Sequence, residues 1–293
     1  MTGREEWDRH DVRRHRRRAG RRRLIGFVTV VVGVAAAAGA VAWKLGRDPA
    51  PPTATVTPPT PLTFPEGWRR EDMARLLEEK TNLSGQGYLE LTKQGRDGAR
   101  LAGRSQATSL EGFLFPATYG IGSETTVEFL VDQQVRAYEA NIAKVDMAYA
   151  RARNLTPYDV LIIASMVERE VVAPAERATV AGVIYNRLRN HMRLDIDATV
   201  QYAVGAWRPL TAADLRSDSP YNTRRFSGLP PGPISNPGLA SLQAAARPRP
   251  SRFLYYVARA DGTHRHYFAE TLEQFDALKA RARANAAAAS PSP

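Results

Sequence analysis

The uncharged apolar run from Leu24 to Trp43 divides this chain into a short basic part and a long remainder. Its 20 residues can form a helix that crosses a hydrocarbon core of about 30 Å. Ten arginines and four acidic residues precede it in residues 1–23. Because positively charged flanks stay in the cytoplasm, we expect a single-pass anchor in the cell membrane. The N-terminus would be cytoplasmic, and everything after Lys44 would be extracytoplasmic.

Two other interpretations of this N-terminal segment remain open. A cleavable signal sequence has a shorter apolar core and an exit of small residues, which residues 40–42 resemble. The length of the run favours the anchor. A nucleic-acid-binding arm is disfavoured, because such arms interleave stacking aromatic residues with their arginines and this one has only Trp7. We therefore predict a membrane partner and no nucleic-acid partner.

The remainder of the chain is large enough to fold. With 43% apolar residues among 293, it can bury a hydrophobic core in one large domain or two smaller ones. It has no cysteine, which excludes disulfide bonds and thiolate chemistry. Residues 47–61 are rich in proline and threonine and show no apolar period. We expect an extended linker there, and the folded part to start near Leu62.

Apolar periodicity and capping residues predict an α+β fold, mainly helical with a small C-terminal β-hairpin. The segments "FLYYVAR" and "HRHYFA" form the expected hairpin, and "ADGT" between them supplies an Asp-Gly turn. Ser123 is expected to cap one long helix and Thr271 the last one. We expect helices in the second half of residues 64–80, at 88–93, 123–143, 156–173, 175–190 and 236–246, and from 271 on.

The apolar helix expected from Thr156 carries two glutamates in "IIASMVEREV", residues 162–171. At about 100° per residue, Glu168 falls among aliphatic residues and Glu170 points to nearly the opposite side. Aliphatic surroundings remove water from a carboxyl group and favour its neutral form, which is the form of a general acid. The alternative is that both glutamates are structural charges, since buried acids are usually paired. The arginines available for pairing are Arg169, Arg177 and Arg187.

A loop dense in proline, glycine and asparagine follows at Ser217 to Gly238. Its prolines fix the backbone before any ligand binds, which lowers the entropy cost of binding. Its aromatic and neutral polar side chains suit a sugar polymer. These side chains belong to Tyr221, Asn222, Thr223 and Asn236. A rigid structural corner without a ligand is the alternative.

Five segments of the chain resemble, in order, the motifs of the YceG-like endolytic murein transglycosylases. They are "LEGFLFPATY" (110–119), "ASMVERE" (164–170), "VIYNRL" (183–188), "MRLDIDATVQYAVG" (192–205) and "SPYNT…GLPPGPISNPG…SLQAAARP". The match extends from about Phe64 to Phe275. The resemblance implies a membrane-anchored lyase without a cofactor, which cuts nascent peptidoglycan strands internally at the MurNAc-GlcNAc bond and leaves 1,6-anhydroMurNAc ends. It also implies membrane-bound cell-wall synthases as partners.

The resemblance assigns catalysis to Glu168, the first glutamate of the family's "ASxVExE" segment. This residue would protonate the departing glycosidic oxygen. As a carboxylate it would then take the proton of the muramic C6 hydroxyl while that oxygen closes on C1. Residues predicted to bind substrate lie in the loop and the matched motifs: Tyr221, Asn222, Thr223, Asp197, Asn186, Asn236 and Glu111.

The resemblance also divides the chain into parts. The family has a fuller LysM-like subdomain before its "PEG" motif, here residues 65–67, so we expect a truncated one. The predicted parts are a cytoplasmic tail (1–23), a transmembrane helix (24–43), a linker (44–61), the truncated LysM-like subdomain with the "LEGFLFPATY" segment (62–122), a catalytic domain (123–280) and a frayed tail (281–293).

Two other functions remain open. A muramidase that hydrolyses the bond would need a second carboxylate facing Glu168. The candidates for this second acid are Asp195, Asp197 and Glu176. An inert, membrane-tethered glycan-binding scaffold would need no acid, and an ion pair of Glu168 with Arg187 or Arg169 would favour it.

Other chemistry has little support in the sequence. His264 and His266 alternate along a predicted strand, but a metal site needs further ligands, so we predict no metal. Ser165 and Ser217 lack the context of a nucleophile elbow, so acyl transfer is not expected.

Overall fold

The computed structural model describes residues 58–93 and 109–289. These described residues all belong to one compact unit. Among the described residues, no helix has the length and apolar character needed to span a membrane. The predicted anchor at 24–43, its basic tail and most of the linker lie outside the described residues. The anchor and the cellular location therefore stay predictions.

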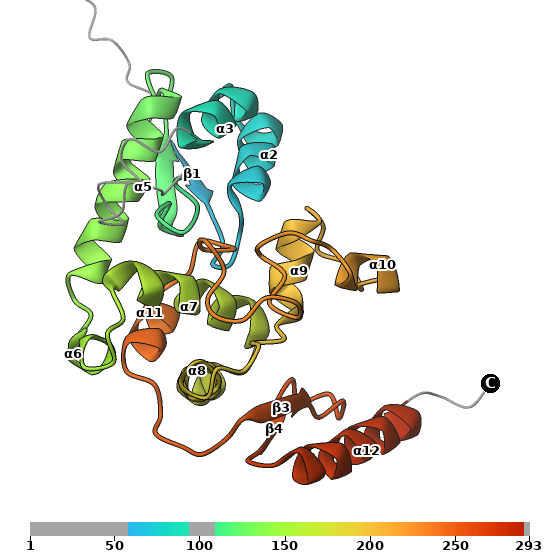
Figure 1. The fold of residues 1–293 in the computed structure, drawn as a ribbon. Coiled ribbons are helices and arrows are strands. Elements are labelled where there is room, and N and C mark those ends of the chain that lie inside the picture. The colour runs from blue at the N-terminus through green and yellow to red at the C-terminus, as the bar shows by residue number, and fades with distance from the viewer. Residues whose placement is uncertain (1–57, 94–108, 290–293) are drawn as a thin grey trace, which may run out of the picture. The chain divides into compact units, whose positions relative to one another are not determined.

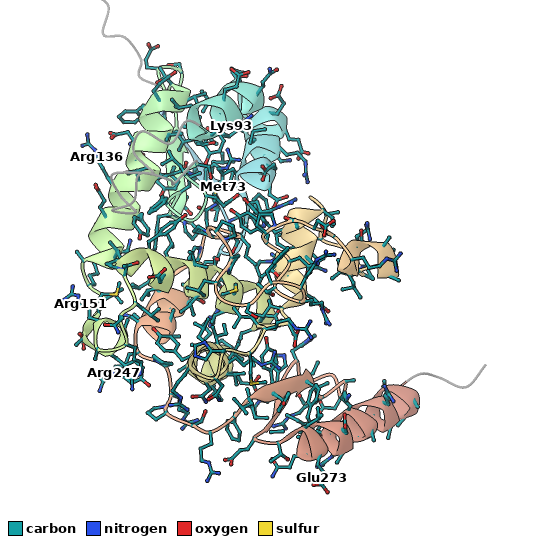
Figure 2. The ribbon with its side chains drawn as sticks, in the orientation of Figure 1. Met73, Lys93, Arg136, Arg151, Arg247 and Glu273 are labelled. Atoms are coloured by element: carbon teal, nitrogen blue, oxygen red, sulfur yellow. The ribbon has the colours of Figure 1, made fainter. Side chains whose placement is uncertain are left out.

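Two strands and two helices make up the first part of the described residues (Figure 1). Strands β1 (Thr60–Thr63) and β2 (Thr118–Ile121) pair in antiparallel fashion. Between them in sequence lie α2 (Arg70–Lys80) and α3 (Gly85–Lys93), which pack against each other. Figure 2 shows Met73 on the inner side of α2, where it is fully buried. This part corresponds to the predicted LysM-like subdomain, whose class stays a prediction.

Helix α7 (Pro157–Glu170) is the centre of the larger helical part (Figure 1). Helices α8 (Arg177–Arg189) and α11 (Leu239–Ala246) both pack on it. All residues of α7 from 158 to 167 are buried, so the helix is covered on every side before its last turn. The remaining helices of this part are α5 (Val127–Ile142), α6 (Ala148–Arg151), the 3-10 turn η1 (Pro174–Glu176), α9 (Asp197–Ala203) and α10 (Ala212–Leu215).

The C-terminal part confirms the predicted hairpin. Strands β3 (Tyr255–Ala258) and β4 (His266–Ala269) pair antiparallel, and α12 (Leu272–Ala289) packs on both. The predicted fold, mainly helical with a small C-terminal hairpin, is thus confirmed for the described residues.

Some predicted boundaries differ from those of the structure. Thr126 rather than Ser123 caps α5, because its hydroxyl accepts the N–H of Phe129 at 3.2 Å. Strand β1 already begins inside the predicted linker. Helix α12 continues to Ala289, so the predicted frayed tail is helical up to that residue.

Candidate active site

Glu168 lies in the last turn of α7, which starts at the predicted capping box of Thr156 and Asp159. Its side chain is only 6% exposed. Its Oε1 accepts a hydrogen bond from Arg177 Nη2 at 3.3 Å, and its Oε2 accepts one from the backbone N–H of Gly238 at 2.9 Å. Both oxygens therefore face donors, an arrangement that stabilises a carboxylate.

Of the two alternatives for Glu168, the structure has the ion pair, with Arg177 as the partner, and the expectation of purely aliphatic surroundings is wrong. Its partner Arg177 is the first residue of α8 and also donates from Nε to Ser241 Oγ at 3.2 Å. The turn η1 returns the chain so that the start of α8 meets the end of α7. The arginines that would have favoured a scaffold bind groups other than Glu168. Arg169 donates to Gly67 O, and Arg187 donates to Leu254 O and Leu194 O.

A second carboxyl group, that of Glu66, lies beside Glu168. A Cβ atom on Gly238 would overlap the Glu66 carboxyl, so this group sits directly against the glycine whose N–H binds Glu168. Glu66 is exposed, yet partial burial and then the negative charge of Glu168 raise its pKa, against the opposite effect of Arg177. Two acids and one arginine thus form a single charged cluster.

Sequence reasoning missed Glu66, although its neighbours carry a signal. Gly67 has a φ of 80°, a conformation that glycine adopts without strain. A Cβ atom on Gly67 would lie 3.4 Å from Cγ of Glu168, so the turn at Glu66 and Gly67 also packs against Glu168. The Pro-Glu-Gly pattern predicts a tight turn, but nothing local to it indicates that this turn meets the end of α7.

Asn236 is fully buried and holds the turn of residues 65–67 in place. We call this turn, which carries Glu66, the acidic turn. Its backbone O accepts the N–H of Gly67 at 2.8 Å, and its backbone N–H donates to Trp68 O at 2.9 Å. Its side chain donates to Trp68 O and to Glu111 Oε1, each at 2.9 Å, and accepts the N–H of Leu114 at 3.0 Å. All its polar atoms are used within the protein, so any part in substrate binding is indirect.

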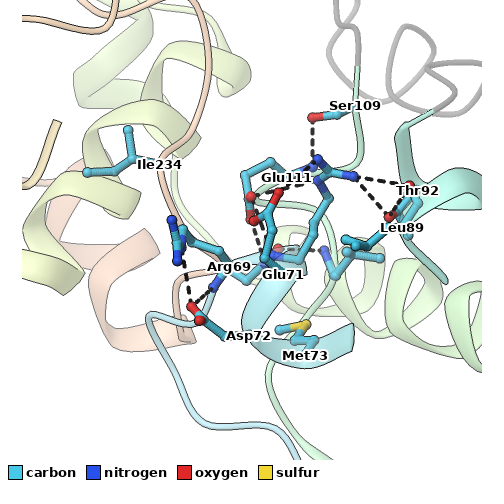
Figure 3. Close-up of polar contacts among 12 residues, drawn as sticks. Arg69, Glu71, Asp72, Met73, Leu89, Thr92, Ser109, Glu111 and Ile234 are labelled. Atoms are coloured by element: carbon cyan, nitrogen blue, oxygen red, sulfur yellow. Dashed lines mark hydrogen bonds and ion pairs between the residues drawn. The ribbon is translucent and has the colours of Figure 1, made fainter. Parts of the chain in front are cut away.

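Glu111, another predicted substrate-binding residue, is 2% exposed and belongs to the same network (Figure 3). Arg70 approaches its Oε2 with Nε at 3.7 Å and with the backbone N–H at 3.4 Å. Burial raises the pKa of Glu111 to about 8, although Arg70 acts in the opposite direction. Glu111 therefore supports the acidic turn from inside the protein.

The remaining uncharged residues that were predicted to bind substrate are mostly buried in the protein. The ring of Tyr221, half-buried, packs 4.9 Å from that of Tyr202. Asn186, Asn222 and Thr223 are buried and bonded to protein atoms. Their partners are, in turn, the carbonyls of Ser251 and Phe253, the carbonyls of Leu215 and Ser217, and the hydroxyl of Thr199. These contacts favour a rigid structural corner, and the binding assignments stay predictions.

Each predicted second acid has a basic partner of its own. The pairs are Asp195 with Arg187 at 3.3 Å, Asp197 with Arg224 at 2.6 Å, and Glu176 with His266 at 2.8 Å. The acid beside Glu168 is instead Glu66.

Glu170 points away from Glu168, as the helical spacing predicts. Its Oε2 accepts a hydrogen bond from the hydroxyl of Tyr256 on β3 at 2.9 Å. Burial raises the pKa of Glu170, and the negative Asp197 adds to this effect. Glu168 and Glu170, the two glutamates at the end of α7, therefore lie in different surroundings.

A cleft of about 280 Å³ adjoins the acidic turn. We call it the tryptophan cleft, and it is lined by Trp68, Asp72, Arg75, Leu76, Glu79, Arg169 and Trp207. Arg169, the neighbour of Glu168, stacks with its guanidinium 3.8 Å from the centroid of Trp207. The indole N–H of Trp207 donates to Asp72 at 3.3 Å, and Arg69 binds the same carboxylate (Figure 3).

A model of the YceG-like family matches residues 38–281. The chain belongs to the YceG-like family. The predicted family is thereby confirmed, and the match includes both Glu66 and Glu168.

Individual proteins that are similar to this chain are consistent with its membership of the YceG-like family. An endolytic murein transglycosylase of Bacillus subtilis is 35% identical over 172 residues, which are 58% of this chain and 47% of the relative. One of Streptococcus pneumoniae is 37% identical over 174 residues, 57% of this chain and 31% of the relative. The chain thus spans half or less of these relatives' length. The crystal structure of a YceG-like protein of Listeria monocytogenes matches with a TM-score of 0.68 and 33% identity, covering 76% of each chain.

Proposed function

We propose that this YceG-like protein is an endolytic lytic transglycosylase that cleaves the MurNAc-GlcNAc bond of peptidoglycan strands and leaves 1,6-anhydroMurNAc ends. The observation that carries the proposal is the place of Glu168. This glutamate of the matched "ASMVERE" segment lies beside an exposed acid, and the next residue, Arg169, lines the tryptophan cleft. The relatives' shared name, endolytic murein transglycosylase, supports the same reaction.

The chemistry of the site suits an internal attack. In a lytic reaction the C6 hydroxyl of the muramic residue replaces water as the nucleophile, so a base must take its proton as the ring closes. Glu168 is a good candidate for this base, because the contacts with Arg177 and Gly238 hold its carboxylate in a fixed position. Its low exposure also limits competition from water.

We assign the tryptophan cleft to a sugar residue of the strand. Its aromatic walls offer apolar faces to a pyranose ring, while its acids and arginines offer hydrogen bonds to hydroxyl and amide groups. The cleft begins at Trp68, two residues from Glu66, so a sugar bound there places the next glycosidic bond near the acids. The N-terminal anchor, the extracytoplasmic location and cell-wall synthase partners belong to the same proposal.

Digestion of purified, uncrosslinked glycan strands tests this function. The full chain should release shortened strands whose new ends have the mass of anhydroMurNAc, and Glu168→Gln should abolish the release. Glu273→Gln is the matched control, because Glu273 is exposed on the outer side of α12 (Figure 2). Hydrated reducing ends would contradict the lytic reaction and indicate a two-carboxylate hydrolase.

A catalytically inert, membrane-tethered glycan-binding scaffold is the second candidate. The ion pair between Glu168 and Arg177 favours it, because a paired carboxylate can have a purely structural role. A scaffold would bind the strands with the same affinity in the original chain and in Glu168→Gln, and neither would shorten them.

A further inference from the structure

Two carboxyl groups, one nearly buried and one exposed, both contact Gly238. Glu168, 6% exposed, accepts the N–H of Gly238, and the exposed Glu66 lies against the α-carbon of the same residue. Pairs of acids in different surroundings often divide the donor and acceptor roles of one reaction. A single-residue mechanism uses only one of these two groups and leaves Glu66 without a task.

We propose that Glu66 is a second catalytic residue: it gives the proton to the departing glycosidic oxygen, and the Glu168 carboxylate takes the proton of the C6 hydroxyl. This inference rests on the proposed lytic reaction and deepens it. It replaces one acid that changes its role during the reaction by two acids with fixed roles.

The contacts of Glu168 leave neither oxygen free to hold a proton at the start of the reaction. Arg177 Nη2 and the Gly238 N–H donate hydrogen bonds to its two oxygens. To act first as an acid, Glu168 would have to give up at least one of these contacts. As the base it keeps both until the proton of the hydroxyl arrives.

Glu66 has the properties that the donor needs. It is exposed, so it can reach a bound strand and take up a new proton from solvent. Partial burial and then the charge of the neighbouring Glu168 raise the pKa of Glu66, which favours its protonated form. Its position is fixed, because Gly67 and Trp68 on its C-terminal side both bond to Asn236.

The step balances without a further reactant. The bond between the muramic C1 and the glycosidic oxygen breaks, and that oxygen receives the proton of Glu66. The C6 oxygen forms its bond to C1 and passes its proton to Glu168. Afterwards Glu66 is charged and Glu168 is neutral, and transfer of one proton from Glu168 to Glu66, directly or through water, restores the starting state.

The rate of strand cleavage against pH tests the division of roles, with the full chain and with Glu66→Gln, Glu168→Gln and the Glu273→Gln control. A general acid contributes about 10²–10⁴-fold, so Glu66→Gln should lose at least about 100-fold. The original chain should lose activity at high pH as the donor ionises, and Glu66→Gln should have no such high-pH limb. Its thermal unfolding should stay unchanged, since the substitution keeps the size of an exposed side chain.

A second measurement tests the interaction between Glu66 and Glu168 without any substrate cleavage. In ¹³C NMR of carboxyl-labelled glutamate, the Glu66 signal should titrate above an ordinary glutamate, and Glu168→Gln should lower its midpoint. If Glu66→Gln retains activity within about twofold of the original chain, or retains the high-pH limb, the inference is wrong while the lytic reaction stands. If the original chain cuts no glycan, the proposed function fails and the inference fails with it.

Discussion

Arg177 Nη2 lies 3.3 Å from Oε1 of Glu168, at a point where both side chains are largely shielded from water. The same guanidinium bonds to Ser241 Oγ of α11, so one arginine connects the ends of three helices. Such a pair holds the carboxylate in a fixed position, and removal of one partner leaves the other as an unpaired charge with little access to water.

Arg177→Met should weaken both stability and activity. The change keeps the length of the side chain but leaves a nearly buried carboxylate without its cation, which costs about 1–3 kcal/mol of unfolding free energy. The cleavage rate should also fall, because the Glu168 carboxylate loses one of the two contacts that hold it in position. Urea unfolding and the rate of strand cleavage measure the two effects.

Arg136→Met is the matched control for this change. Arg136 pairs with Asp132 on the surface of α5, with both side chains more than half exposed (Figure 2). Its loss should cost less than about 1 kcal/mol. Equal losses at the two positions would show that the shielding of Glu168 has no energetic consequence.

Gly238→Ala should lower activity with little effect on the fold. The new Cβ would overlap the Glu66 carboxyl and displace it, whereas the N–H that binds Glu168 remains. The φ of Gly238 is −77°, which alanine adopts readily, so the unfolding free energy should change by less than about 1 kcal/mol. The cleavage rate should fall as it does in Glu66→Gln.

Gly87→Ala provides the comparison for a glycine on a helix surface. A Cβ there makes ordinary contacts at 3.4 Å with Ser84, so stability should rise slightly and cleavage should be unchanged. Full activity in Gly238→Ala would mean that the position of Glu66 does not matter.

Glu111→Gln should remove a pH dependence of stability. The folded chain keeps this carboxyl protonated up to about pH 8, whereas the unfolded chain loses the proton near 4.5. The stabilising contribution is thus complete below 4.5 and is lost as the pH rises through about 8. The urea midpoint should fall from pH 6 to pH 9 by less in Glu111→Gln than in the original chain. Glu128→Gln, an exposed change, should behave like the original chain.

Trp207→Ala should raise KM for glycan strands about tenfold and leave kcat within about twofold, because it removes binding surface in the tryptophan cleft and no reacting group. Phe129→Ala is the control, since Phe129 is 51% exposed on α5, outside the cleft. An unchanged KM in Trp207→Ala would argue against a sugar in this cleft. A fall in kcat alone would show that Trp207 acts by supporting Arg169.

Local patterns predicted the framework of this site, because they depend on neighbours in sequence. The capping box of Thr156 fixes where α7 begins, and helical spacing then sends Glu168 and Glu170 to different sides. The same spacing could not provide Arg177 or Glu66, since their contacts depend on how turns bring distant segments together.

The loop residues show why polar composition alone was misleading. Asn222, Thr223 and Asn236 looked suited to bind a ligand, yet all are buried and bonded to protein atoms. A loop rich in proline and glycine forms few regular backbone hydrogen bonds, so buried carbonyl and N–H groups need side-chain partners. Asparagine and threonine side chains can be these partners. A loop rich in them therefore looks the same in sequence whether the side chains bind a ligand or satisfy the buried backbone.

The bonds of Gly67 and Trp68 to Asn236 have a consequence for how the protein is made. A growing chain exposes Glu66 long before Asn236, the residue that fastens the turn of Glu66 and Gly67, has been synthesised. Until Asn236 and Gly238 emerge, nothing holds Glu66 beside Glu168. A fragment that ends before Asn236 would therefore contain both acids but not their common arrangement.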